Sequence, residues 1–127
     1  MFEKVTGDVL VQVSPAYVKE QSQPERGHYF FAYKVVIHNQ GDKPLQLLRR
    51  HWIITDGEGR VEEVEGDGVV GQQPRLEPGE RFQYTSFCPL QTPTGNMQGT
   101  YFLEDAEKKI LEVKIPMFLL CEPSHFH

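Results

Sequence analysis

Residues 28–60 read HYFFAYKVVIHNQGDKPLQLLRRHWIITDGEGR and predict a long β-hairpin. In the first half, successive side chains alternate between two sides of the chain, a period typical of a strand and not of a helix. Gly41 and Pro44 then suit a chain reversal before a second strand starts at Leu45. One side of the first strand would carry a row of large side chains, namely Tyr29, Phe31, Tyr33, Val35 and Ile37. Buried rings of this kind need a second layer, which the rest of the chain is expected to supply.

Length and composition favour one all-β domain covering residues 1–127. A chain of 127 residues can bury a sizeable core without disulfides or a structural metal. The 11 glycines and 9 prolines recur between short apolar runs, and no segment has the pattern of a long amphipathic helix. We expect the end of the chain, from about residue 121 to 127, to be a flexible tail.

Further strands are expected at a spacing typical of a two-layer sandwich, in which Trp52 would be the buried tryptophan. A bend is expected where Pro15 interrupts the first strand, and a β-bulge where the alternation breaks near Arg49. The fold class is therefore a fibronectin type III-like or immunoglobulin-like β-sandwich of about seven to eight strands. The additional expected strands are 8–18, 61–65, 82–90, 99–103 and 110–115.

Charge and residue usage disfavour several classes of function. The net charge of −5 disfavours a nucleic-acid-binding protein, because phosphate backbones are bound by lysine and arginine. The first residues lack the build of a signal peptide, and no apolar run is long enough to span a membrane. With only Cys88 and Cys121, a disulfide framework is not expected, so we expect a cytoplasmic protein.

Gly66, Gly68 and Gly71 have the spacing of a dinucleotide-binding fingerprint. That fingerprint needs a helix after the last glycine, whose N-terminus holds the pyrophosphate. Here Pro74 follows instead, and the acidic residues of 62–67 would repel a phosphate. A glycine-rich connection with backbone angles that other residues avoid is the favoured interpretation.

Two other clusters suggest binding. Arg49, Arg50 and Trp52 belong to the only basic and aromatic cluster, which could bind a phosphate or an acidic partner; on a strand such arginines are more often solvated or paired with glutamates. Cys121, His125 and His127 combine ligand types that suit Co²⁺, Ni²⁺ or Zn²⁺, although a short terminus is usually mobile.

Signatures of enzymes are missing from the sequence. There is no Gly-x-Ser-x-Gly elbow, no His-Glu-x-x-His and no P-loop. Cys88 occupies an apolar position in a strand pattern, so we expect a core residue and not a reactive thiol.

Four stretches give the chain a close resemblance to the ApaG family, also called CorD. They are residues 31–60, 64–86 (VEGDGVVGQQPRLEPGERFQYTS), 92–102 (TPTGNMQGTYF) and 113–118 (VKIPMF), and the resemblance extends from about Val9 to Phe118. It implies an immunoglobulin-like sandwich, a genetic link to cobalt resistance and magnesium efflux, and use of the domain as a protein-interaction module. The family's glycine motif falls on Gly66, Gly68 and Gly71, for which the resemblance implies a pyrophosphate site. The tail from Leu119 departs from the family pattern.

The first functional hypothesis is a non-enzymatic module that binds an unidentified protein near residues 66–71 and 49–52, by addition of a strand to a sheet edge or through an apolar patch. The alternative is a regulator of ion homeostasis that binds a divalent cation or pyrophosphate; no other cofactor is expected. A phosphoanhydride hydrolase ranks last. An exposed sheet edge allows a monomer or a homodimer.

Overall fold

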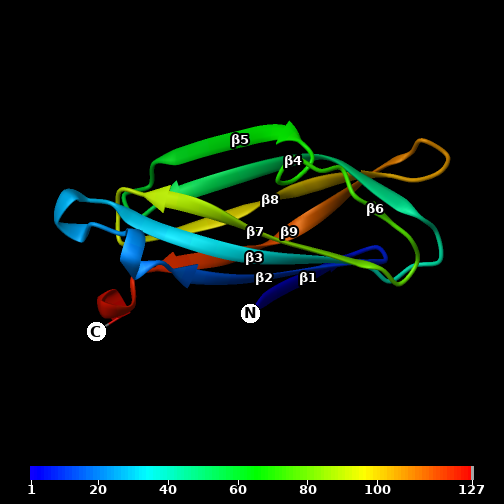
Figure 1. The fold of residues 1–127 in the computed structure, drawn as a ribbon. Helices are drawn as coiled ribbons and strands as arrows, with labels where there is room; N and C mark the ends of the chain where they lie inside the picture. Colours follow the sequence, from blue (N-terminus) through cyan, green and yellow to red (C-terminus); the bar gives the residue numbers. More distant parts are fainter. Residues whose placement is uncertain (127) are drawn as a thin grey trace.

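The computed structural model describes residues 1–126 as two antiparallel β-sheets packed face to face (Figure 1). Nine strands form the two sheets: β1 (Phe2–Thr6), β2 (Val9–Tyr17), β3 (Tyr29–Asn39), β4 (Leu45–Asp56), β5 (Val61–Asp67), β6 (Arg75–Leu76), β7 (Arg81–Leu90), β8 (Thr94–Glu104) and β9 (Ile110–Cys121). Three short 3₁₀ helices complete the described chain: η1 (Lys19–Gln21), η2 (Pro24–Arg26) and η3 (Pro123–Phe126). The expected all-β sandwich is confirmed.

The strand order within each sheet determines which edges are open. One sheet has the order β1-β2-β3-β7, and the other has the order β5-β4-β8-β9, with the short β6 paired to β4 as well. All pairings are antiparallel. Strands β7 and β5 are therefore terminal strands of different sheets.

The predicted hairpin of residues 28–60 is wrong, although both of its strands exist. Strand β3 pairs with β2 and β7, whereas β4 pairs with β5, β6 and β8, so the two strands lie in different sheets. The buried side chain of Asn39 donates to the carbonyl oxygens of Lys43 and Leu76 at 2.8 and 3.0 Å. These bonds hold the connection where the chain leaves one sheet for the other, and alternation alone does not reveal that step.

Strand boundaries also differ from the expectation of seven to eight strands. The strands β1 and β6 were not expected; β8 begins at Thr94 instead of at residue 99, and β9 continues past residue 115 to Cys121. In β9 the alternation breaks at Pro116, which is buried next to buried Ile115, and this break hid the second half of the strand. The expected bulge is confirmed: the pairing of β4 with β8 shifts register between Leu47 and Arg49.

The core lies between the sheets and is centred on the only tryptophan. Trp52 is 3% exposed, and its ring makes edge contacts with Tyr33, Tyr101 and Phe118 at centroid distances of 5.3, 6.1 and 5.9 Å. Such edge-to-face arrangements add to the hydrophobic gain of burial. The predicted core side of β3 is confirmed, because Phe31, Tyr33, Val35 and Ile37 are all buried.

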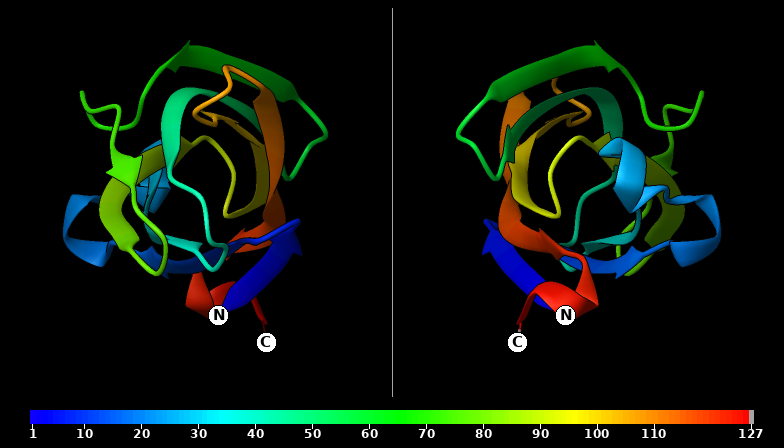
Figure 2. Two further views of the ribbon diagram at one scale, coloured as in Figure 1. Left: turned by 90° about the vertical axis from the view of Figure 1, so that its right-hand side faces the viewer. Right: turned by 90° about the vertical axis from the view of Figure 1, so that its left-hand side faces the viewer.

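The two sides of the sandwich differ in how the edge strands of the two sheets meet. On one side β1 lies beside β9, and the Lys114 backbone N–H donates to the Thr6 hydroxyl at 3.0 Å (Figure 2). On the other side, β5 and β7 end their sheets without pairing to each other. The sandwich is thus closed along β1 and β9 and open along β5 and β7. No helix among the described residues is long and apolar enough to cross a membrane.

Candidate functional site

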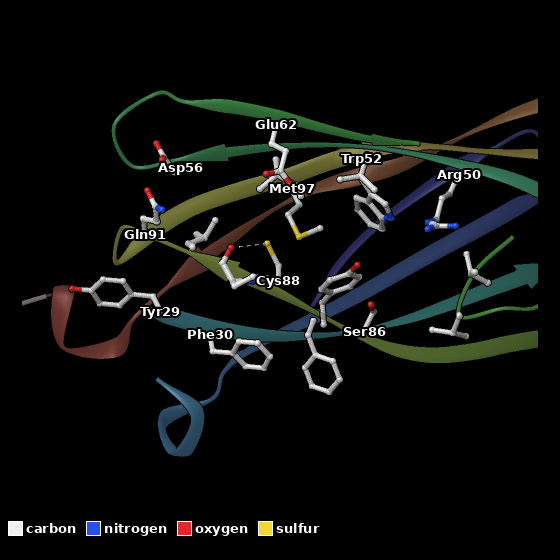
Figure 3. A pocket seen from close by; sticks show the side chains of 18 of the residues that line it. Tyr29, Phe30, Arg50, Trp52, Asp56, Glu62, Ser86, Cys88, Gln91 and Met97 are labelled. Atoms are coloured by element: carbon white, nitrogen blue, oxygen red, sulfur yellow. Dashed lines mark hydrogen bonds between the residues drawn. The ribbon is translucent and has the colours of Figure 1, made fainter. Parts of the chain in front are cut away.

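A cleft of about 990 Å³ opens between the edges of β5 and β7 (Figure 3). Side chains of both sheets line it, together with the segment that follows β5. Its apolar lining includes Tyr33, Trp52, Ile54, Val64, Phe87, Leu90 and Met97. Concave sites with a mainly apolar lining and a few polar groups are where proteins usually bind ligands. The cleft is therefore the candidate site.

Arg50 points into this cleft from β4, in register with Gly66 on β5. Its Nη1 atom donates to the carbonyl oxygens of Asp67 and Gly68, both at 2.9 Å. A Cβ atom on Gly66 would lie 3.0 Å from Nη1 and 3.1 Å from the guanidinium carbon. The absence of a side chain at Gly66 thus makes room for Arg50, and Arg50 in turn holds the chain that leaves β5.

Behind Arg50 lies a cluster of buried hydroxyl groups. The hydroxyls of Tyr84 and Tyr101 are hydrogen-bonded to each other, which joins β7 to β8 across the sandwich. Burial raises the pKa of both tyrosines above the usual value, and it also raises the pKa of Tyr33, where a hydrogen bond with Ser86 offsets part of the rise. The positive charge of Arg50 lowers all three pKa values in part. The phenols therefore stay neutral at pH 7.

The glycine motif is a tight turn and not a helix start. Val69 and Gln72 exchange backbone hydrogen bonds of 2.8 and 2.9 Å, with Val70 and Gly71 as the central residues at φ of 43° and 79°. Positive φ at both central positions is the signature of a type I′ turn. Gly68 has a φ of 62°, and its backbone N–H donates to the Leu48 carbonyl oxygen at 2.8 Å. Because no helix follows, the mechanism of the dinucleotide fingerprint does not apply to this loop.

Val70 is the unexpected residue of this turn. A β-branched residue at positive φ is a genuine outlier, since its side chain crowds the backbone. Its side chain is nevertheless 51% exposed and lines the cleft. Burial in the core therefore does not explain why a strained valine occupies this position.

The structure separates the three residues predicted as a basic and aromatic cluster. Arg50 and Trp52 face the cleft from the same side of β4, whereas Arg49 is exposed on the other side, where it stacks 4.3 Å over the Phe102 ring. Trp52 is almost fully buried, so its main contribution is to packing. Arg50 and the glycine motif of residues 66–71, which the first functional hypothesis assigned to the same binding region, are neighbours in the structure.

The metal site predicted at the tail lies partly outside the described residues. Cys121 is the last residue of β9 and is half-buried, but His127 and the side chain of His125 fall outside what the structure describes. Among the described residues, no group of three or more histidine, cysteine, aspartate or glutamate side chains could hold a metal ion. The tail site stays a prediction.

Two further titratable side chains of the cleft, those of Cys88 and Asp56, have shifted pKa values. Burial raises the pKa of the Cys88 thiol to about 11, with a smaller contribution from the Glu62 carboxylate. The thiol is therefore protonated at neutral pH, and the expectation of a buried core cysteine is confirmed. Asp56 is paired with Arg60 at 2.7 Å, and this bond holds the pKa of the carboxyl below its usual value.

Sequence reasoning missed the hydroxyl cluster and the cleft itself. Tyr33 and Tyr84 belong to strands that are far apart in sequence, and nothing in the sequence says that these strands are neighbours of each other and of Arg50. The one available signal was the polar Ser86 at an inward position of β7, directly opposite Tyr33.

The chain is similar to known proteins over nearly its whole length. The family model of the ApaG domain matches residues 19–105. Protein ApaG of Bordetella pertussis is 56% identical over 120 residues, which cover 94% of this chain and 92% of that protein. Protein ApaG of Paramagnetospirillum magneticum is 50% identical over 123 residues, covering 97% and 95%. A crystal structure from Bordetella pertussis, described as an ApaA protein, superimposes with a TM-score of 0.89 at 57% identity and covers 91% of this chain and 94% of that one.

Proposed function

Because the chain belongs to the ApaG family, we propose that it is a non-enzymatic module that binds an extended segment of another protein in the cleft between β5 and β7. The observation that carries this proposal is the position of the cleft, between two terminal strands of different sheets. Backbone groups on the outer side of a terminal strand can pair with an added strand, while pockets beside the strand receive its side chains.

The lining of the cleft supports protein binding over catalysis. Phe87 stacks on Phe30 with a centroid distance of 5.4 Å and is still 53% exposed, and Val61 on the opposite wall is 61% exposed. Large exposed apolar groups beside a groove are typical of interaction sites. Neither Cys88 nor Asp56 is set up for catalysis, since the thiol is protonated and the carboxylate is held by Arg60.

Site-specific crosslinking in cells tests this function. A photoreactive amino acid is placed at Val70 or Phe87 in the cleft, and at Met117 on β9 as the control, because the three residues have similar exposures of 51%, 53% and 54%. We expect the same crosslinked protein from both cleft positions and not from Met117. Identical products from all three positions, or none from the cleft, would contradict the proposal.

The family resemblance suggests the physiological setting. We place the module in the cytoplasm, as a monomer or homodimer, where its partner would belong to the response that underlies cobalt resistance and magnesium efflux.

The direct alternative is that the chain itself binds a divalent cation or pyrophosphate. The proximity of Arg50 to the turn of residues 68–71 favours pyrophosphate among these ligands. Calorimetric titration with Co²⁺, Mg²⁺ and pyrophosphate separates the two, because a protein-binding module should give no saturable heat.

A further inference from the structure

We propose that Arg50 anchors an aspartate or glutamate side chain of the segment bound in the cleft. This inference rests on the proposed function and adds the chemistry by which a partner is selected. It assigns ligand binding to Arg50 alone. The glycine motif supports Arg50 and is not itself a phosphate site.

The hydrogen-bonding state of Arg50 leaves one side of its guanidinium available. Nη1 carries two hydrogens, and both are directed at backbone carbonyls, those of Asp67 and Gly68. Within the described part of the chain, Nε and Nη2 donate to no protein group. These two nitrogens form the fork that pairs with the two oxygens of a carboxylate. The arginine is thus held in place by one side and free to bind by the other.

Arg50 also lacks an internal counter-ion, unlike Arg60 and Arg75. Arg60 lies 2.7 Å from the Asp56 carboxylate and Arg75 lies 3.6 Å from Glu77, but no carboxylate among the described side chains comes within 4.0 Å of Arg50. The guanidinium is half-buried, and a charge withdrawn from water is costly unless it is paired. A bound carboxylate would supply the missing partner.

Charges along the cleft favour a single carboxylate over a phosphate. Arg50 lies near one end, beside Trp52 and Ser86, whereas Glu62 and Asp56 lie farther along toward Tyr29 (Figure 3). Asp67, whose carbonyl oxygen accepts from Arg50, is a third acidic residue of the lining. A monovalent group at Arg50 avoids most of the repulsion that these carboxylates would exert on a multiply charged anion. In addition, the amides of Gly68, Val69 and Gln72 are already bonded to carbonyls, so the adjacent turn offers few donors to phosphate oxygens.

The length of the two strands that form the walls favours an acidic side chain of the partner over the carboxylate at its C-terminus as the bound group. The walls are formed by β5, which is 7 residues long, and β7, which is 10 residues long. Such edges suit a strand that continues past Arg50, with one acidic side chain turned toward the guanidinium. A free C-terminal carboxylate as the anchor is an outcome that the experiment distinguishes.

The test starts from a library of random twelve-residue peptides, displayed on phage without a free C-terminus and selected on the full chain. Selected peptides are synthesised with blocked ends, and their affinities are measured for wild type, Arg50→Gln, Arg50→Lys and the control Arg49→Gln. We expect one recurrent Asp or Glu, whose change to Asn or Gln weakens binding about ten- to a hundredfold, as for other charge-assisted hydrogen bonds. Arg50→Gln should remove this difference, Arg50→Lys should restore part of it, and Arg49→Gln should leave it unchanged.

The outcomes separate the inference from the proposed function. Peptides that compete with one another, are blocked by Phe87→Arg and show no dependence on an acid would overturn the role of Arg50 and leave the cleft as a binding site. Peptides that require a free C-terminus after their ends are unblocked would overturn the choice of a side chain. Peptides unaffected by Phe87→Arg, or no peptides at all, would overturn the proposed function and the inference with it.

A second measurement does not depend on peptides or on the stability of a variant. In wild-type protein the Arg50 Nε–H resonance is followed during titration with sodium acetate, with sodium chloride and sodium phosphate at equal ionic strength. We expect a saturable shift with acetate and none with chloride. A stronger shift with phosphate, or equal shifts with all three salts, would overturn the assignment to a carboxylate.

Discussion

At the scale of single residues, Gly68 shows why the glycine motif is needed without any ligand. It has a φ of 62°, and a Cβ atom there would lie 2.2 Å from the Gln72 carbonyl oxygen. Gly68→Ala therefore combines backbone strain with a clash against main chain, and we expect a loss of about 2–3 kcal/mol in the free energy of unfolding. Urea denaturation followed by Trp52 fluorescence measures this loss.

Gly71→Ala is the matched control, because Gly71 has a similar φ of 79° but nothing within 4 Å of the added Cβ. Only the cost of placing alanine at positive φ remains, so the free energy of unfolding should fall by about 1 kcal/mol. Equal losses at the two positions would show that the contact with Gln72 does not contribute. The sequence predicted unusual backbone angles here, but it could not predict Val70 at positive φ, since valine is among the residues least suited to that conformation.

At the scale of elements, the turn between β4 and β5 makes stability depend on pH. The Asp56 side chain accepts hydrogen bonds from the Glu58 and Arg60 backbone N–H groups at 2.8 and 3.0 Å and from the Arg60 side chain at 2.7 Å. Chiefly because of the Arg60 side chain, the pKa of Asp56 lies below 3.8 in the folded protein. The ionised form is thus favoured by folding, so its contribution is present above about pH 4 and is lost as the pH falls through the lower folded pKa.

Asp56→Asn should therefore flatten the fall in the denaturation midpoint between about pH 4 and pH 2, when urea curves are compared across that range. Arg60→Gln should flatten it in the same way, because the arginine is the main cause of the shift. An acid profile of Arg60→Gln that coincides with that of wild type would contradict this explanation.

The hydrogen bond between Tyr84 and Tyr101 is a second element-scale feature, because it joins β7 of one sheet to β8 of the other. Tyr101 is fully buried and Tyr84 is 7% exposed, so water cannot replace a lost partner. Tyr84→Phe or Tyr101→Phe should each cost about 1–3 kcal/mol, whereas the double variant should cost clearly less than the sum. A double-mutant cycle in urea measures the coupling; additive losses would show that the two hydroxyls do not depend on each other.

Features of this scale that depend on a single strand can be predicted from the sequence. The core side of β3, the bulge near Arg49 and the buried Cys88 all follow from alternation within one strand. The pairing of strands does not: β3 and β4 follow each other in the sequence but lie in different sheets, and the alternation within each strand is the same in either arrangement. The cleft depends on that pairing, so Arg50, Tyr33 and Ser86 could not have been joined into one site from their spacing.

At the scale of the whole molecule, the two sides of the sandwich differ in whether the edges of the two sheets lie against each other. The β1 strand lies along β9 and closes one side, while the opposite side has a cleft and two terminal strands. Because β1 pairs with β2 only from Val9 to Val13, Pro15 lies beyond that pairing, although it stays in register with Tyr33 of β3 on the other side of β2. The N-terminal residues thus belong to the closed side.

This arrangement predicts that a residue next to the N-terminus contributes to global stability. Phe2 is half-buried, and its ring lies 6.3 Å from that of the core residue Phe118, whereas Val5 on the same strand is 56% exposed. Phe2→Ala should lower the free energy of unfolding by about 1–3 kcal/mol, less than for a fully buried phenylalanine, and Val5→Ala by less than about 0.5 kcal/mol. Urea denaturation measures both losses. If β1 instead frayed from β9 in solution, Phe2→Ala would be as neutral as Val5→Ala, and amides of β9 near Lys114 would lose their protection from hydrogen exchange.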